Sequence, residues 1–214
     1  MAMDFFAFLG LVLVVSLSGV LMPGPLTAAV VVRSYSDRWA GAKVAVGHAF
    51  VELPLFLAIA LGASAFLQQN IVLVEVIGLV GGAYLLFFAI TMLRDKEFIS
   101  DEKVDKNKFT GNAMVLGVMT TLFNPGFLLW WAVFGALVIA QGIEMGLGLA
   151  VLTFVWFMHW LLDLGWGVAL SFGIQKAKQF YASQLREIIR IGCATLILIF
   201  GVYFALSSGW SLLT

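Results

Sequence analysis

Six long apolar runs occupy most of this sequence, and their length constrains the fold more than any other feature. A helix needs about 20 mostly apolar residues to cross a bilayer. The runs are 5–32, 44–67, 71–93, 114–140, 145–172 and 188–206. Hydrophobic residues make up 62% of the chain and charged residues 11%, an apolar excess that a soluble domain could not bury. We therefore expect an all-α integral membrane fold with six transmembrane helices in a single domain, 1–214.

Basic residues are confined to three of the connections between these runs. All twelve Lys and Arg flank or fill the first, third and fifth connections, and the other connections and both termini have none. Cytoplasmic connections of membrane proteins retain an excess of Lys and Arg. We therefore predict that these three connections face the cytoplasm and that both termini lie outside the cytoplasmic membrane. The third, 94–109, mixes five basic and five acidic residues and reads as a solvated loop between halves of about 1–93 and 110–207.

Charge and cysteine content exclude several functional classes. The formal net charge is zero and no basic stretch is interleaved with aromatic residues, so we expect no nucleic-acid partner. The only cysteine, Cys193, permits no intramolecular disulfide and no cysteine metal cluster. Ser64 and Ser171 are isolated and no HExxH motif is present, so we expect no enzyme and no cofactor. Asp4 replaces the basic start of a signal peptide, which predicts that the first run is retained as a helix.

Two of the apolar runs are interrupted by proline and glycine. The interruptions are Pro23-Gly24-Pro25, with Thr27 following, in the first run and Asn124-Pro125-Gly126 in the fourth. Proline removes a backbone donor and glycine tolerates unusual dihedral angles, so each run should split into two half-helices. Asn124 suits the N-cap and Pro125 the first position of a second half-helix, and Pro25 can begin the matching one.

A histidine and a carboxylate occur four residues apart in the second run and again in the fifth. The pairs are His48 with Glu52 and His159 with Asp163, each pair on one helical face. The first three runs therefore match the last three in order: a broken helix, a helix with a histidine and an acid, and a plain helix. Three spans in each half give the halves opposite orientations. This pattern predicts the inverted repeat of secondary transporters.

The two acids should be deep in the membrane. At ~1.5 Å per residue, Glu52 lies roughly 14 Å from Lys43, and Asp163 roughly 20 Å from Lys176. An ionised acid at mid-membrane costs about 2.5–3.5 kcal/mol, so both should face the bundle interior or a water-filled cavity. We expect these acids and the two helix breaks to form one central site.

Several motifs along nearly the whole chain support a family resemblance. They are Pro23-Gly24-Pro25, Gly41, Gly47, Gly82-Ala83-Tyr84-Leu85 and Asn124-Pro125. Together with six spans, they resemble the lysine exporter and threonine/homoserine exporter family of amino-acid translocators. The resemblance implies proton-coupled export of amino acids by two inverted three-helix repeats. One departure is Gly126, where many members of the family have a lysine.

These features lead to a hypothesis for the mechanism. The carboxylate of an amino acid would bind at the half-helix N-termini after Pro25 and Pro125, where free N–H groups favour an anion. Its ammonium group would pair with Glu52 or Asp163. The same acids, with the two histidines tuning their proton affinity, would exchange protons for substrate. The expected partners are an amino acid, protons and the bilayer, and a homo-oligomer is compatible with the sequence.

Other interpretations remain open from the sequence alone. His48, Glu52, His159 and Asp163 could instead ligate zinc or manganese in a divalent metal transporter, if their helices face each other. In a purely structural interpretation, each acid hydrogen-bonds to the histidine of its own helix and stabilises the bundle. The proline breaks would then be kinks that neighbouring helices tolerate.

Overall fold

A computed structural model describes residues 4–62, 70–94 and 112–213, and within these ranges all regular secondary structure is helical. The elements are α1 (Phe5–Val20), α2 (Pro25–Ser34), α3 (Ala40–Ala60), α5 (Ile71–Arg94), α6 (Ala113–Leu122), α7 (Pro125–Trp130), the π-helical segment η2 (Trp131–Gly135), α8 (Ala136–Glu144) and α9 (Leu149–Leu213). This confirms the predicted all-α fold. The predicted loop 94–109 lies outside the described residues except for its first residue.

The described helices account for the expected membrane spans. Five segments are long and apolar enough to cross a bilayer, and α1 with α2 makes a sixth, bent by 66° at the break between them. The five are Ala40–Ala60, Glu75–Arg94, Pro125–Glu144, Leu149–Phe180 and Gln184–Leu213. The chain is therefore a multi-pass membrane protein.

Both predicted helix breaks are present, and each second half-helix begins at the expected proline. Gly24 is the N-cap and Pro25 the first residue of α2, and Asn124 and Pro125 have the same roles in α7. After the second break the chain stays helical from Pro125 to Glu144, slightly beyond the predicted end at 140.

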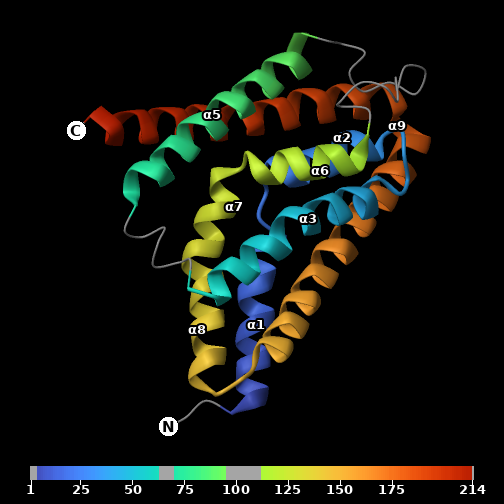
Figure 1. Ribbon diagram of the computed structural model, residues 1–214. Coiled ribbons are helices and arrows are strands. Elements are labelled where there is room, and N and C mark those ends of the chain that lie inside the picture. The colour runs from blue at the N-terminus through green and yellow to red at the C-terminus, as the bar shows by residue number, and fades with distance from the viewer. Residues whose placement is uncertain (1–3, 63–69, 95–111, 214) are drawn as a thin grey trace.

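The last two spans differ from the prediction. We expected an irregular connection over 173–187, but α9 continues through it as helix. This segment contains no proline and is rich in Lys, Gln and Ala, which favour helix even where the sequence is too polar for the membrane. Figure 1 shows that α9 turns sharply between its two arms, which we call arm 1 (Leu149–Phe180) and arm 2 (Gln184–Leu213).

The basic ends of several helices are tied together at this turn of α9. Arg190 donates to the backbone carbonyls of Met92 at 3.2 Å and Leu93 at 2.9 Å, near the end of α5. Lys178 donates to the carbonyl of Tyr35, which follows α2, at 2.9 Å. Cationic donors at the ends of helices satisfy terminal carbonyls and complement the helix dipole. These contacts join the ends of α2 and α5 to the turn of α9, which lies on the right in Figure 1, away from both termini.

An acid in the connection between α2 and α3 is held by its neighbours. Asp37 accepts hydrogen bonds from Lys43 Nζ at 2.6 Å and from the backbone N–H of Trp39 at 2.9 Å. Burial by itself would raise the pKa of Asp37, but these two donors and the charges of Lys43 and Arg33 hold that pKa below its ordinary value. The connection therefore contains an ionised acid at neutral pH.

Candidate functional site

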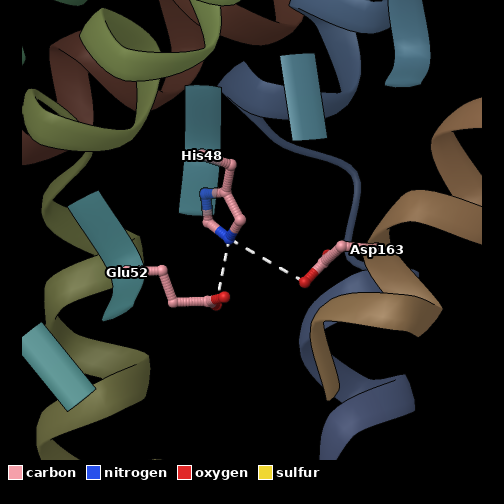
Figure 2. A group of neighbouring side chains, drawn as sticks. All are labelled: His48, Glu52 and Asp163. Carbon is pink, nitrogen blue, oxygen red and sulfur yellow. Dashed lines mark hydrogen bonds and ion pairs between the residues drawn. The ribbon is translucent and has the colours of Figure 1, made fainter. Parts of the chain in front are cut away.

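The two histidine-acid pairs predicted from the sequence meet in the structure. His48 Nε2 lies 3.0 Å from Glu52 Oε1 and 3.8 Å from Asp163 Oδ2. His159 Nε2 lies 3.2 Å from the same Glu52 oxygen and 3.4 Å from the same Asp163 oxygen. Figure 2 shows three of these side chains pointing toward one another from α3 and α9. We call the four residues the polar cluster.

Two close helix crossings bring the cluster together. A Cβ on Gly41 would lie 1.9 Å from the carbonyl oxygen of Gly167, and one on Gly47 would lie 2.0 Å from that of Met114. No side chain fits at either distance, so α3 can approach arm 1 of α9 and α6 only because these positions are glycine. His48 lies one residue beyond Gly47 on α3, and Asp163 one turn before Gly167 on α9.

Glu52 is enclosed by hydrogen-bond donors. Its side chain is fully buried. One carboxylate oxygen faces both cluster histidines and accepts from Trp131 Nε1 at 3.3 Å, and the other accepts from Trp156 Nε1 at 3.0 Å. A buried carboxylate is stable when several donors satisfy it. No sequence pattern identified either tryptophan as a partner of Glu52. A buried indole N–H requires an acceptor, and this rule is the only general indication that tryptophans near a buried acid could donate to it.

Asp163 has the same sequence context but a different environment. Its side chain is 11% exposed, and its buried Oδ2 accepts no hydrogen bond from any described residue, with the His159 nitrogen 3.4 Å away. A buried carboxylate oxygen without a hydrogen bond is costly and favours a cationic or hydrogen-bonding partner. Asp163 is therefore the member of the cluster with free capacity for a ligand.

Hydrogen bonding around His48 defines where a proton must lie. The Thr121 hydroxyl donates to the carbonyl of Gly117 at 2.7 Å, so it can only accept from His48 Nδ1 at 2.8 Å. His48 therefore carries a hydrogen on Nδ1, an assignment that follows from the network. One further proton must lie between His48 Nε2 and Glu52, on either partner. No sequence pattern identified Thr121 as part of the site.

A cavity of about 90 Å³ joins the cluster to both helix breaks. This is room for several water molecules. Among the predicted site residues, its lining includes Gly24, Pro25, Thr27, Asn124, Gly126 and all four cluster residues. Pro23 and Pro125 do not line it, and Pro125 instead faces a groove on the other side of α7. The structure thus brings the cluster and both helix breaks to one cavity, without these two prolines.

The two helix breaks present different surfaces to this cavity. Gly24 has no side chain to cap α2, so the first N–H groups of that helix have no capping side chain. Asn124, by contrast, accepts from the Gly126 N–H at 3.1 Å and caps α7, which is only six residues long. Of the two half-helix N-termini predicted as anion sites, the one at α2 is the uncapped one.

Trp130 is a further cavity residue that the sequence interpretation missed. Its ring stacks on His159, with centroids 5.3 Å apart and planes 21° apart. This contact fixes one face of the imidazole and narrows the cavity beside the cluster. Little in the sequence indicated a cavity role for Trp130, because it is one of seven tryptophans in an apolar chain.

The cluster has ligand atoms suited to a metal ion, but some of them are already occupied. Ligand atoms of His48, Glu52 and Asp163 lie within 4.8 Å of one another. Both Glu52 oxygens, however, accept indole N–H groups, which would have to be displaced from any oxygen that bound zinc. The environment of Glu52 therefore suits protons better than a metal ion.

Comparison with known proteins gave one family match. A sequence model of the LysE type translocator family matches residues 17–208, a range that includes both helix breaks and the whole polar cluster. The searches of curated proteins and of solved structures found no match.

Proposed function

The chain belongs to the LysE type translocator family and is a membrane translocator of small molecules, and we propose that it exports amino acids or close derivatives by proton antiport. The observation that supports this proposal best is the cavity that connects an uncapped helix N-terminus with an unsatisfied carboxylate. These two groups have opposite polarity, as do the two ends of an amino acid.

The uncapped N-terminus of α2 is suited to the substrate carboxylate. The backbone N–H groups after Pro25 lack a capping side chain, and the helix dipole adds positive potential at this end. Gly24 and Thr27 line the same stretch of cavity, and the Thr27 hydroxyl donates to the carbonyl of Met22 at 3.2 Å. The absence of a side chain at Gly24 lets an anion approach the backbone closely.

The substrate ammonium is assigned to Asp163. Both acids contact the same two histidines, but only Glu52 has its oxygens occupied by indole donors as well. None of the described residues donates a hydrogen bond to Asp163 Oδ2, so this oxygen can accept one from an ammonium group without displacing a donor. We therefore assign Glu52 the role of anchoring the cluster and Asp163 the role of binding substrate.

Competition at Asp163 provides the coupling. One buried carboxylate can be neutralised by a proton or by an ammonium group, and carrying both would leave an excess positive charge in a low-dielectric site. A proton arriving from outside would displace the ammonium group, and a substrate from inside would displace the proton. His48 and His159, each near both acids, are placed to pass the proton between them.

The proposed orientation follows from the gathering of basic side chains at the turn of α9. Basic connections remain on the cytoplasmic side, so this end of the bundle would face the cytoplasm and both termini would lie outside. An epitope at the C-terminus should then be accessible to antibody on intact cells. Labelling that requires permeabilised cells would indicate the opposite orientation.

Flux in proteoliposomes tests the function directly. Purified protein would be tested under an imposed pH gradient with a panel of amino acids and of zinc and manganese salts. We expect amino-acid flux driven by the gradient, lost in Asp163→Asn and retained in the control Glu144→Gln, which replaces an acid outside the cavity. Full flux in Asp163→Asn would overturn the assignment of the acid. Metal flux without amino-acid flux would favour the divalent cation transporter.

A further inference from the structure

A second and larger opening lies on the other side of the second helix break. It has a volume of about 690 Å³ and is bounded by α3, α5, α7, η2 and arm 2 of α9. Its lining is mostly apolar and includes Glu75, Gly78, Leu129, Ala132, Tyr203 and Ser207. We call it the outer groove. The site described above uses none of these residues.

Only a thin wall separates the outer groove from the central cavity. Pro125 lines the groove, whereas its neighbours Asn124 and Gly126 line the cavity. Phe204 lines the groove and Phe200 the cavity, and their rings stack with centroids 6.2 Å apart. The wall is therefore the backbone around Pro125 and two phenylalanine rings.

The wall is thinnest where Phe204 packs on Gly126. A Cβ at Gly126 would lie 3.3 Å from the Phe204 ring, so the ring packs directly on the glycine, with no side chain between them. The π-helical segment η2 begins six residues after Pro125, and such segments are common at functional sites because their looser hydrogen bonding permits local adjustment. Phe204 therefore forms part of the barrier between the two spaces.

The groove lies at the end of the bundle opposite the basic residues. Ser207 is 17 residues beyond Arg190 on α9, and Glu75 is 19 residues before Arg94 on α5. At ~1.5 Å per residue these separations are roughly 26–29 Å, close to the ~30 Å thickness of a hydrocarbon core. If the basic end faces the cytoplasm, the groove is near the outer surface.

We propose that the outer groove is the release site of the exported solute. The solute would pass from the central cavity between Gly126 and Phe204 into the groove, and leave from there to the outside. Its chemical class, an amine or zwitterion with an apolar side chain, rests on the function proposed above. The half-buried carboxylate of Glu75 suits the ammonium group, and the apolar walls suit the side chain.

Two observations favour a solute over a lipid tail or a second copy of the chain. The groove shares its wall with the central cavity, which a lipid site or a subunit interface does not require. A carboxylate on the lining is also costly beside an acyl chain, and it has a role if a cation passes it. The serines at 207 and 208 add hydroxyl groups to the same lining.

Cysteine accessibility tests whether the groove opens to external water. In a Cys193→Ser background, Ala132→Cys would be labelled on intact cells with the impermeant cationic reagent MTSET. The matched control is Phe134→Cys, an exposed position of η2 that is not on the groove lining. Because only an ionised thiolate in contact with water reacts, we expect labelling at least about tenfold faster at position 132.

A second measurement tests the wall. Thr27→Cys places a thiol in the central cavity, where access from outside should be slow. We expect Phe204→Ala to raise its labelling rate about tenfold, since thiolate reactivity follows access to water, and Leu206→Ala, a lipid-exposed control on the same arm, to leave it unchanged. Phe204→Leu, which retains most of the packing, should give an intermediate rate. This variant separates opening of the wall from loss of the fold.

A third measurement tests Glu75. Glu75→Gln should slow labelling of Ala132→Cys by cationic MTSET about two- to fivefold, but not labelling by the anionic reagent MTSES, because the acid attracts only the cation. Equal effects on both reagents would remove the role assigned to Glu75.

Two outcomes would overturn the proposal as a whole. In one, Ala132→Cys reacts no faster than Phe134→Cys, and Phe204→Ala has no effect at Thr27→Cys. In the other, Ala132→Cys forms a disulfide-linked dimer, which would make the groove an interface between copies. These tests do not depend on flux, so failure of the amino-acid antiport would leave them interpretable.

Discussion

The two histidine-acid pairs have the same spacing in the sequence, yet the structure gives their acids different environments. Glu52 on α3 is fully buried, lies within hydrogen-bond distance of two histidines and accepts from two tryptophans. Asp163 on α9 is slightly exposed, and its buried oxygen accepts no hydrogen bond from the described residues. The difference indicates that the motif's two copies are not interchangeable. Both acids line the cavity, but only Glu52 has indole donors on both carboxylate oxygens.

The two helix breaks differ in the same way. The break in the second half is capped by its own Asn124 side chain, and the break in the first half has Gly24 at the N-cap and no capping side chain. Each half of the chain therefore contributes one group whose hydrogen bonds are satisfied and one open group, which has free capacity for a partner. In the first half these are Glu52 and the N-terminus of α2, and in the second half they are Asn124 and Asp163. The open features face the same cavity, so the site needs both halves.

The largest expected effect is loss of stability in Glu52→Gln. The amide would turn an NH₂ group toward indole or imidazole donors, and a broken buried ionic network typically costs about 3–5 kcal/mol. Thermal unfolding in detergent would measure the change. If Glu52→Gln unfolds like the wild type, the acid does not anchor the cluster.

Asp163→Asn should show the reverse behaviour. Because its buried oxygen has no hydrogen bond to lose, we expect the free energy of unfolding to change by less than about 1 kcal/mol. Proton-driven flux should nevertheless be abolished. Measuring unfolding and flux on the same preparations of both acid variants gives the sharpest form of the comparison, and equal losses of stability would contradict it.

Trp156→Phe tests the donors around Glu52. The phenyl ring keeps much of the packing but removes the N–H that reaches the second carboxylate oxygen at 3.0 Å. Leaving a buried acceptor without its donor should cost about 1–3 kcal/mol. Trp160→Phe is a useful control, because its N–H donates at 2.8 Å to the carbonyl of Ala45, outside the cluster. If the Trp156 N–H acts through Glu52, flux should change in Trp156→Phe and not in Trp160→Phe.

Exchanging the capping states would test the two breaks. Asn124→Ala removes a cap and should lower stability by about 1 kcal/mol, whereas Gly24→Ser adds one and should raise it by a few tenths of a kcal/mol. Gly24 has extended backbone angles and open space around it, so serine fits there. If the α2 terminus binds the substrate carboxylate, Gly24→Ser should also raise the KM for export. An unchanged KM would indicate that the substrate carboxylate binds elsewhere.

The smallest expected effect is at Asp37, outside the membrane. Its pKa is lower in the folded protein than its ordinary value, so its contribution to stability is present above about pH 4 and is lost as the pH falls through the lowered pKa. Solvent screens the pair with Lys43, so Asp37→Asn should cost no more than about 0.5 kcal/mol at pH 7. The cost should vanish in strong acid. Unfolding midpoints at several pH values would check this.

Much of the fold was predictable because its signals are local. Apolar length predicted the spans, and proline positions predicted where α2 and α7 begin. The continuous helix of α9 was missed because 173–187 was judged by its polarity, and polarity marks the limits of a membrane span rather than the end of a helix. The donors Trp131 and Thr121 were missed because each acquires its role only through contact with another helix.

The sequence by itself determined an all-helical membrane chain, its two helix breaks and the four polar residues that had to avoid lipid. These follow from chain-local rules: hydrocarbon excludes charge, and proline cannot continue a helix. Only the tertiary structure decided which acid is satisfied and which is open. That outcome depends on the crossings at Gly41 and Gly47, where the absence of a side chain lets backbones approach and sets which donors reach Glu52. Such contacts join residues more than 60 positions apart, and no local pattern encodes them.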